Sequence, residues 1–339
     1  MKAYQIQAGA GTSGLIRAER PSRTLGPADI RVRMEAASVN ARDLAFARGT
    51  FPNPPATPIV PLVDGCGTVV EIGPEVTRFR IGDRVVTTYY PHWIDGAMTR
   101  TRTASSFGAQ VDGTLAQEMA GSQEWFERAP ASIDAAAAAT LSCAGLTAWN
   151  ALFCVAPPKP GATVLLLGTG GVSIWALQLA SAAGLRTILT SSQDAKLERA
   201  RGLGASDIVN YRTTPDWQDE VLRLTEEAGV DLVVEVGGEG TIGRSLQACG
   251  TGGTVVVVGR VAGSGGVLIE PGALIGGGKR LTGITAGSRA MLADLVRFVD
   301  ASRISPVVDA TFDFEDAREA YEHVATGSHF GKVAIAIND

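Results

Sequence analysis

The sequence predicts an α/β fold in which a doubly wound parallel sheet is joined to a smaller, strand-rich domain. From residue 163 onward, short apolar runs alternate with helical patterns, which is typical of a parallel sheet with crossover helices. Before residue 143, short strand-like runs are separated by frequent turns, as in a small antiparallel barrel or a distorted sandwich. The chain has 339 residues, more than one hydrophobic core usually supports, so we expect two domains.

Composition excludes several classes of protein. Hydrophobic residues make up 45% of the chain and charged residues 19%, which is typical of a globular protein rather than a disordered one. The formal net charge is −5 and no basic run is present, so we expect neither nucleic acid nor an anionic membrane as a partner. The start of the chain has no signal-peptide pattern, and no apolar stretch reaches membrane-spanning length without polar interruption. We therefore expect a soluble, cytoplasmic protein.

In the first part of the chain, alternation of apolar and charged residues predicts a half-exposed strand over residues 29–36. Residues 51–58 contain a proline cluster and are expected to form a loop. A strand over 63–73 is interrupted by two glycines, which indicate bulges or tight corners. A further strand is expected over 84–87, and alanine-rich helices over 134–153 that join near residue 143.

In the second part, strands and helices alternate regularly. Expected strands are 163–167, 187–189, 208–211, 230–236, 254–258 and 281–285, and expected helices are 172–183, 217–228, 242–249 and 289–301. The tail is expected to contain strands 306–308 and 332–337 around a helix over 314–325. Nothing in this tail resembles a nucleotide-binding half, so we expect it to return to the first domain.

A glycine-rich turn lies between the strand 163–167 and the following helix. It contains Gly168, Gly170 and Gly171, and the helix begins near Val172. Glycines let the backbone approach a pyrophosphate, whose charge the N–H groups of the helix start can bind. Ser173 replaces the last glycine of the usual pattern, but serine is small enough for close packing. An ordinary βα turn is the alternative; strand, turn, helix and second strand in this order favour a Rossmann dinucleotide site.

The end of the second strand indicates which dinucleotide. Sites that select NAD place an acidic residue about 20 residues after the glycines, where this chain has Ser191 and Ser192. Two hydroxyls and the nearby Lys196 suit a 2′-phosphate. Asp194 falls in the first turn of the next helix, where a carboxylate is favourable in any case. We therefore predict NADP(H), with the strand ends at Val236 and Gly259 bordering the nicotinamide half.

A metal site is not expected. The four cysteines are far apart and form no CxxC pair, and the three histidines do not complete a cluster. Structural and catalytic zinc sites need grouped thiolate and imidazole ligands.

Four segments together resemble the medium-chain dehydrogenase/reductase superfamily over nearly the whole chain. They are GCGTVVEIGPEVTRFRIGDRV (65–85), GTGGVS (168–173), KLERARGLGA (196–205) and HFGK (329–332). The resemblance implies a GroES-like β-barrel catalytic domain formed by residues 1–143 and 289–339, and a Rossmann domain over 144–288. It also implies an active site in the cleft and a homodimer that continues the Rossmann sheet through 281–285.

Within this superfamily the chain is more similar to the zinc-free branch that resembles quinone oxidoreductases. The first catalytic cysteine of zinc members corresponds to Asn40 here and their histidine to Val63, which leaves only Cys143. One thiolate cannot hold a catalytic zinc, and the structural zinc lobe is replaced by residues 89–96. The resemblance implies that NADPH delivers hydride to a small-molecule substrate, either a quinone or the activated C=C of an enone. The negative charge that develops then spreads onto a distant oxygen.

The same resemblance implies roles for individual residues. Asn40 is expected beside the nicotinamide as an orienting polar group. Asp43 belongs to the same motif, with a loop or helix-cap role equally open. Thr147 corresponds to a position near the cofactor, or is a plain helix residue.

Lys196 and Tyr211 correspond to residues that bracket the 2′-phosphate, although a solvated lysine and a packed tyrosine are the alternatives. Lys332 could reach the cofactor or lie on the surface at a strand end. His92, or Tyr89 or Tyr90, could donate a proton to the product; simple packing of the aromatic loop, which also holds Trp93, is the alternative.

Two further functions stay open from the sequence. One is NADP-dependent carbonyl–alcohol interconversion, with a side-chain donor in place of zinc. The other is an NADPH-binding protein without catalytic activity.

Overall fold

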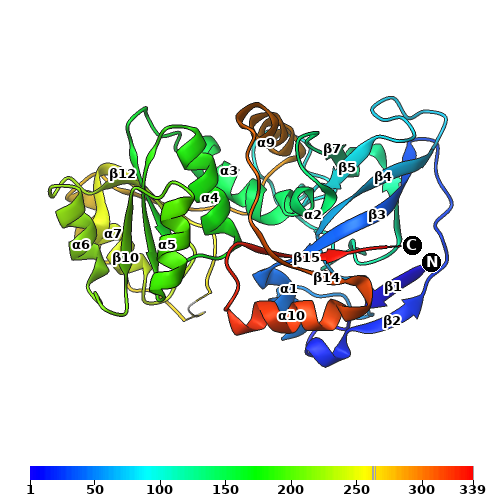
Figure 1. The fold of residues 1–339 in the computed structure, drawn as a ribbon, viewed down its shortest axis with the longest axis horizontal. Helices are drawn as coiled ribbons and strands as arrows, with labels where there is room; N and C mark the ends of the chain where they lie inside the picture. Colours follow the sequence, from blue (N-terminus) through cyan, green and yellow to red (C-terminus); the bar gives the residue numbers. More distant parts are fainter. Residues whose placement is uncertain (262, 264, 339) are drawn as a thin grey trace. The chain divides into compact units, whose positions relative to one another are not determined.

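The computed structural model describes residues 1–261, 263 and 265–338. Residues 262 and 264, within the expected Rossmann domain, and residue 339, within the expected GroES-like domain, lie outside the described residues. The chain divides into two compact units (Figure 1), unit 1 with residues 1–146 and 287–339 and unit 2 with residues 147–286. The sequence places these two boundaries after residue 143 and before residue 289.

The long strand β3 (Asp29–Val39) is the centre of unit 1. It pairs antiparallel with β4 (Asp64–Ile72), with β6 (Glu118–Ser122) and with the C-terminal strand β15 (Lys332–Ala336). In the described residues the sheet order is β14-β15-β3-β4-β5-β7, with β6 beside β3. The remaining strands of this unit are β5 (Arg84–Thr87), β7 (Phe126–Arg128), β14 (Val308–Asp313) and the antiparallel pair β1 (Lys2–Gln5) and β2 (Ile16–Glu19).

The two glycines of β4 lie where β3 comes close. A Cβ atom at Gly67 would lie 2.2 Å from the carbonyl oxygen of Arg33, and one at Gly65 would lie 2.5 Å from the Met34 side chain. The β3–β4 register shifts nearby, between Met34 and Ala36. The glycines are therefore needed for close approach at an irregular point of the ladder.

The helices of unit 1 are α1 (Ala41–Ala47), α2 (Ala135–Ala138), α9 (Arg289–Ser302) and α10 (Ala317–Thr326), with 3₁₀ turns at Thr12–Gly14, Gln123–Trp125 and Phe314–Asp316. From α2 the chain continues through a π-helical turn, α3 (Leu146–Trp149) and a second π-helical turn. The predicted junction near Cys143 is the first of these turns, Leu141–Gly145. Residues 135–154 are long and apolar enough to span a membrane, but 78% of the tested stretch is buried in the protein, as in a core helix.

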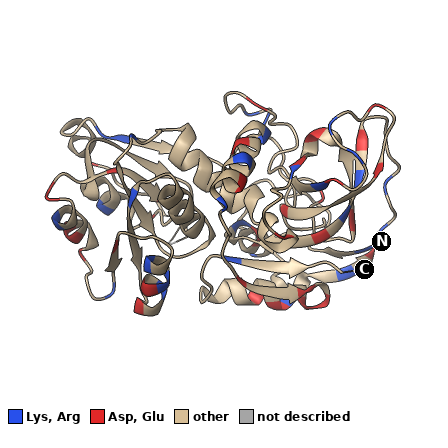
Figure 2. Ribbon diagram, turned by 45° about the horizontal axis from the view of Figure 1, so that its top comes forward, with Lys and Arg blue, Asp and Glu red and all other residues tan. Residues whose placement is uncertain are grey.

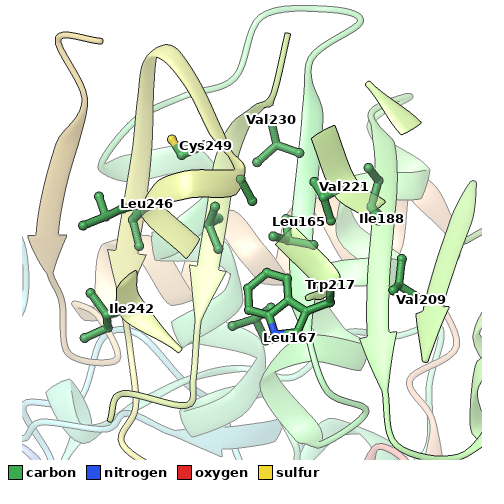
Figure 3. Close-up of a cluster of buried hydrophobic side chains, with 13 residues drawn as sticks. Leu165, Leu167, Ile188, Val209, Trp217, Val221, Val230, Ile242, Leu246 and Cys249 are labelled. Atoms are coloured by element: carbon green, nitrogen blue, oxygen red, sulfur yellow. The ribbon is translucent and has the colours of Figure 1, made fainter. Parts of the chain in front are cut away.

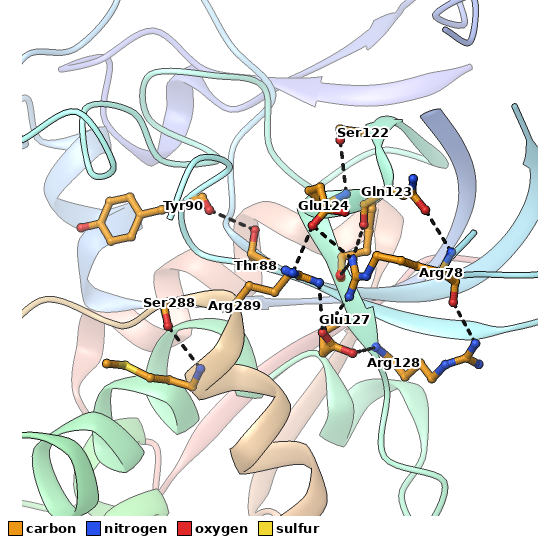
Figure 4. Close-up of polar contacts among 12 residues, drawn as sticks. Arg78, Thr88, Tyr90, Ser122, Gln123, Glu124, Glu127, Arg128, Ser288 and Arg289 are labelled. Atoms are coloured by element: carbon orange, nitrogen blue, oxygen red, sulfur yellow. Dashed lines mark hydrogen bonds and ion pairs between the residues drawn. The ribbon is translucent and has the colours of Figure 1, made fainter. Parts of the chain in front are cut away.

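A network of charged side chains holds the start of α9 (Figure 4). Arg289 forms ion pairs with Glu124 at 3.1 Å and with Glu127 at 3.7 Å. Arg78 pairs with the same Glu127 at 2.8 Å. The backbone N–H of Arg289 also donates to the carbonyl oxygen of Trp93. The chain that returns from unit 2 is thus attached to β7 and to the aromatic loop over residues 89–96.

Unit 2 contains a six-stranded sheet in the described residues, with the order β10-β9-β8-β11-β12-β13 and parallel pairing throughout. Its strands are β8 (Thr163–Leu167), β9 (Arg186–Ser191), β10 (Asp207–Asn210), β11 (Val230–Glu235), β12 (Cys249–Val257) and β13 (Arg280–Gly283). Its further helices are α4 (Gly171–Ala182), α5 (Asp194–Gly202), α6 (Trp217–Leu224), α7 (Ile242–Ala248) and α8 (Gly272–Ile275). The doubly wound parallel sheet predicted from the sequence is confirmed.

Buried side chains from the strands and from α6 and α7 form one hydrophobic cluster of unit 2 (Figure 3). Leu165 and Val233 come from neighbouring central strands and are fully buried, and Trp217 packs from α6. Because burial of apolar surface dominates folding free energy, this cluster stabilises the packing of α6 and α7 against the sheet.

Most predicted elements differ from the observed ones by one to three residues at an end, and three differ more. Strand β12 begins at Cys249, five residues before the predicted start at 254. Helix α6 ends at Leu224, before the predicted residue 228, because Glu226 and Glu227 have left-handed backbone conformations with φ of 52° and 66°. The strand predicted at 306–308 is instead β14, which begins at Val308. Pro306 has no backbone N–H to donate to a ladder.

Positive and negative side chains are interspersed in each unit (Figure 2). This distribution agrees with the absence of a basic run in the sequence.

Candidate functional site

The glycine turn of unit 2 has the backbone geometry that phosphate binding requires. Gly168 has a φ of +75°, which favours glycine, and a Cβ atom at Gly168 or Gly170 would meet nothing within 4 Å. Helix α4 begins at Gly171 with Gly170 as its N-cap, so no side chain caps it. The first N–H groups of a helix, here those of Gly171 and Val172, have no partner within the helix. An anion can therefore approach these groups.

Ser173 explains why this turn tolerates a serine at its last position. The Ser173 hydroxyl donates to the carbonyl oxygen of Leu167 at 2.7 Å, and the side chain is buried. It thus ties the first turn of α4 to the end of β8.

The structure brings Ser191 and Tyr211 together at the end of β9. The backbone N–H of Tyr211 donates to the Ser191 carbonyl oxygen at 3.0 Å, and the Tyr211 side chain is 41% exposed. Ser191 is buried, Ser192 is partly exposed, and Lys196 is largely buried on α5. The Asn210 amide donates to Asp194 at 2.6 Å. The nearest carboxylate to this strand end therefore already has a partner within the protein.

Val236 and Gly259 follow the ends of the adjacent strands β11 and β12. A Cβ atom at Gly259 would lie 2.8 Å from the Val236 carbonyl oxygen, so the two segments approach closely. The fully buried Glu235 holds this region in place. Its carboxylate accepts hydrogen bonds from the backbone N–H groups of Gly237 (2.7 Å) and Gly238 (3.0 Å), and from the hydroxyls of Thr241 and Ser245.

In unit 1, Asn40 is the N-cap of α1 and lies at the end of β3. Its backbone N–H donates to Asp43 Oδ2 at 2.8 Å. The Asp43 carboxylate therefore fixes the first turn of this helix, which is the helix-cap role left open by the sequence.

The Asn40 side chain lies in a buried polar network formed by three neighbouring strands. Asn40 Nδ2 donates to Asp64 Oδ2 at 3.0 Å, and Lys332 Nζ donates to Asn40 Oδ1 at 2.6 Å. Lys332 and Asp64 form an ion pair of 3.2 Å, with side chains 3% and 0% exposed. Lys332 is therefore neither on the surface nor open to solvent.

Burial raises the pKa of Asp43 to about 6, with the nearby Arg42 guanidinium acting in the opposite direction. Asp43 Oδ1 is buried and has no hydrogen-bond partner among the described residues. Burial also raises the pKa of the Cys143 thiol. The thiol of Cys143 therefore stays protonated at neutral pH.

The aromatic loop is mostly packed rather than open. Tyr89, Tyr90 and Trp93 are buried, with the two tyrosine ring centres 4.6 Å apart. Burial raises the pKa of Tyr89 well above its usual value, and the Arg42 guanidinium lies over its ring at 4.8 Å. His92 is exposed between buried neighbours. In unit 2, Thr147 is buried at the first residue of that unit.

Comparison with known proteins decides the family. Residues 26–131 match the alcohol dehydrogenase GroES-like domain, and residues 171–301 match the zinc-binding dehydrogenase domain. A zinc-type alcohol dehydrogenase-like protein of Schizosaccharomyces pombe is 39% identical, over 93% of this chain and 92% of its own length. The chain belongs to the zinc-type alcohol dehydrogenase-like family of medium-chain dehydrogenases/reductases. The predicted superfamily, its GroES-like and Rossmann fold and its class of oxidoreductase are thereby confirmed.

Solved structures support the same assignment. A crystal structure from Sinorhizobium meliloti 1021 with a provisional alcohol dehydrogenase name has a TM-score of 0.92 and 38% identity, over 99% of both chains. A structure described as an NAD-dependent alcohol dehydrogenase has a TM-score of 0.89 and 31% identity, over the full length of both chains. A nicotinamide cofactor is typical of this family.

Asn40 and Val63, which the resemblance relates to zinc ligands, do not offer ligands to zinc in this structure. Asn40 is bound through its side chain to Asp64 and Lys332, and Val63 is an apolar, fully buried residue. No group of three or more His, Cys, Asp and Glu side chains suited to a metal ion occurs within residues 1–261, 263 and 265–338. A catalytic zinc needs three protein ligands.

Sequence reasoning missed Asp64 and Glu235. Each is an acidic residue inside an apolar run, in PLVDGCG and VDLVVEVGG. Such residues are rarely buried without a partner, and this rule could have identified both. Their partners could not be read from the sequence, because Lys332 lies at the opposite end of the chain from Asn40.

We expect the Asp43→Asn variant to gain stability relative to the wild type as pH rises from about 4 to about 6. The folded-state pKa of about 6 exceeds the ordinary value of 3.8, so ionisation of the wild-type carboxyl lowers stability across this window. The loss is complete above pH 6, and two pKa units correspond to about 3 kcal/mol. Asparagine keeps an acceptor for the Asn40 N–H but does not titrate.

Urea unfolding at pH 4, 5, 6 and 7 measures the difference, with the exposed Asp216→Asn variant as the control. A difference between Asp43→Asn and wild type that does not change with pH would contradict this prediction.

Proposed function

We propose that this dehydrogenase transfers hydride from NADPH to a quinone or to the activated C=C of an enone, without zinc. The observation that carries the proposal is the buried amide, carboxylate and ammonium network at Asn40. By the resemblance stated from the sequence, Asn40 corresponds to a metal ligand of zinc members. Without a Lewis acid on the oxygen, charge developing directly on a carbonyl is poorly stabilised, whereas conjugate addition spreads the charge over several atoms.

Unit 2 supplies the residues that would hold NADPH. The glycine turn Gly168–Gly171 and the N–H of Val172 bind the pyrophosphate, and Ser191, Ser192, Lys196 and Tyr211 surround the 2′-phosphate. Thr147, Val236 and Gly259 border the nicotinamide half. When bound, the cofactor supplies the hydride. The hydroxyl residues Ser191 and Ser192 stand where an NAD site places its carboxylate, which supports NADP(H) over NAD(H).

Unit 1 supplies orientation and a proton. Asn40, held by Asp43 and Asp64, orients the nicotinamide, and Lys332 acts on that same amide. His92 is exposed, and its imidazole is the candidate donor of a proton to the product. Tyr89 is the alternative donor, since its raised pKa keeps its hydroxyl protonated.

Carbonyl–alcohol interconversion is the second candidate. It is favoured by the names of the relatives, which include an NAD-dependent alcohol dehydrogenase at 31% identity. In this reaction the protonated Tyr89 would replace zinc as the electrophile. A protein that binds NADPH but turns over no acceptor is the third candidate, and the burial of the Asn40 network supports it.

We place the reaction in the cytoplasm, since Cys66, Cys143 and Cys249 are thiols rather than disulfides. The interspersed surface charges favour a small-molecule substrate over nucleic acid or membrane.

Metal-free protein is expected to oxidise NADPH with quinones or enones, and a chelator is expected to leave the rate unchanged. The reason is that no step needs a Lewis acid. Turnover against a panel of quinones, enones and aldehydes, with zinc measured on the same sample, tests this. One zinc per chain, or turnover of aldehydes alone, would contradict the proposal.

Replacement of Ser192 by Asp is expected to raise KM for NADPH about tenfold or more, equivalent to about 1.4 kcal/mol. The new carboxylate repels the 2′-phosphate but can accept a hydrogen bond from a ribose hydroxyl. KM for NADH is expected to stay equal or fall. The exposed Ser328→Asp variant in unit 1 is the matched control, and an equal loss of both cofactors would refute the assignment.

A homodimer through the edge strand β13 is the proposed assembly. Leu268 is 97% exposed, Ile275 79% and Val261 73%, all on the segment that leads into β13. We expect sedimentation velocity to give twice the chain mass, and Leu268→Asp with Ile275→Asp to give the monomer. The exposed Ile81→Asp variant in unit 1 is the control; a monomeric wild type would refute this assembly.

A further inference from the structure

The Asn40 amide is held from both ends in one orientation. Oδ1 accepts from Lys332 Nζ at 2.6 Å, and Nδ2 donates to Asp64 Oδ2 at 3.0 Å. An ammonium group only donates and a carboxylate only accepts. The oxygen must therefore face Lys332 and the nitrogen must face Asp64, so the usual ambiguity between the two amide flips does not arise here.

The two residues that hold Asn40 are themselves fully engaged. Lys332 Nζ has three acceptors within 3.2 Å, namely the Val39 carbonyl oxygen at 2.8 Å, Asn40 Oδ1 and Asp64 Oδ2. An ammonium group has three N–H donors, so none is left over for a cofactor. Asp64 Oδ2 also accepts from the Ser38 hydroxyl at 2.6 Å. Both side chains are buried.

The remaining hydrogen-bonding capacity of Asn40 follows from these contacts. One Nδ2 hydrogen goes to Asp64, and the other points toward the Ser38 carbonyl oxygen at 3.4 Å. Oδ1 uses one lone pair for Lys332, and an amide oxygen has two. The second lone pair faces the backbone N–H of Asp43 in the capping box of α1, so a bound molecule that donates to Oδ1 competes with this cap.

We propose that Asp64 and Lys332 are positioning residues that act on the reaction through Asn40. They hold its amide so that Oδ1 accepts a hydrogen bond from an N–H or O–H group of the bound molecules. Asn40 therefore orients a donor and does not stabilise an enolate oxygen. This inference rests on the proposed function, in which Asn40 lies beside the reacting groups.

A purely structural role for the ion pair leads to different behaviour. A buried ion pair is weak evidence for stability, because desolvation of both charges offsets their attraction. If the pair only supported the fold, substitutions of Lys332 or Asp64 would lower the melting temperature. They would also change kcat by the same factor in the wild-type and in the Asn40→Ala background. If the pair acts through Asn40, its effect on turnover disappears when Asn40 is removed.

A double-mutant cycle on the whole enzyme separates the two. Lys332→Met and Asp64→Asn are each expected to lower kcat about tenfold or more, as second-layer partners of functional groups do, with KM for NADPH changed by less than about twofold. In the Asn40→Ala background, the same changes are expected to alter kcat by less than about twofold. Lys332→Arg is expected to restore part of the loss, and the exposed Lys2→Met is the control.

Equal losses in both backgrounds would overturn the proposal, as would a rise in KM for NADPH as the main effect of Lys332→Met. Should a single variant fail to fold because it leaves one charge buried alone, the double variant Asp64→Asn/Lys332→Met removes both charges and serves in its place.

A second measurement does not depend on activity. The chain has five asparagines, so ¹⁵N-asparagine labelling of the wild type gives five side-chain amide pairs, and the Asn40 pair is the one lost in Asn40→Ala. Asp64→Asn adds a sixth pair, which is recognised because the wild type lacks it. We expect this pair to exchange slowly with solvent in the wild type and about tenfold or more faster in Lys332→Met or Asp64→Asn. Melting curves confirm that the variants are folded.

The two measurements distinguish the possible failures. A wild type that turns over neither quinone nor enone refutes the proposed function, while the NMR result still tests the positioning of the amide. An exchange rate of the Asn40 side-chain amide that is unchanged in both folded variants would refute the positioning roles, whatever the substrate.

Discussion

The pairing of β15 with β3 is the constraint on which the rest of unit 1 depends. The register sets Val333 opposite Val39, so Lys332 lies level with Asn40, the residue that follows β3. On the other side of β3, the register with β4 sets Ser38 opposite Asp64. Each of three neighbouring strands thus contributes a polar group at one end of the sheet, and each charge is buried only because the others satisfy it. A shift of one residue in β15 would point the ammonium to the other face.

Unit 2 uses a buried carboxylate for a different purpose. Glu235 ends β11 and binds the N–H groups of Gly237 and Gly238, so the turn after this strand is satisfied within the protein. The turn after β8 has no such group, because Gly170 caps α4 without a side chain. One turn at the carboxyl edge of the sheet is therefore closed by its own acid, whereas the other has no side chain that caps the N–H groups of its helix.

The sequence predicted those features that depend on neighbours along the chain. The glycine turn with its flanking strand and helix, the parallel sheet and the glycines of β4 all follow from local patterns. The early end of α6 and the start of β14 depend on backbone conformations at Glu226 and Glu227 and on the place of Pro306, which periodicity does not register. The Asn40 network could not be predicted from the sequence for another reason. Its members meet only after β15 has joined the sheet, and 292 residues separate Lys332 from Asn40.

The free energy of burying an ion pair indicates what the Asn40 network contributes. Replacing a buried ion pair by apolar residues of similar size is often neutral or stabilising, so stability alone gives little reason to bury Lys332 and Asp64. What the pair adds is direction, since an ammonium and a carboxylate on opposite sides leave an amide only one orientation. The same ammonium would repel a nearby metal cation. The contacts that orient Asn40 and the charge of the buried lysine therefore both support the proposed reaction without zinc.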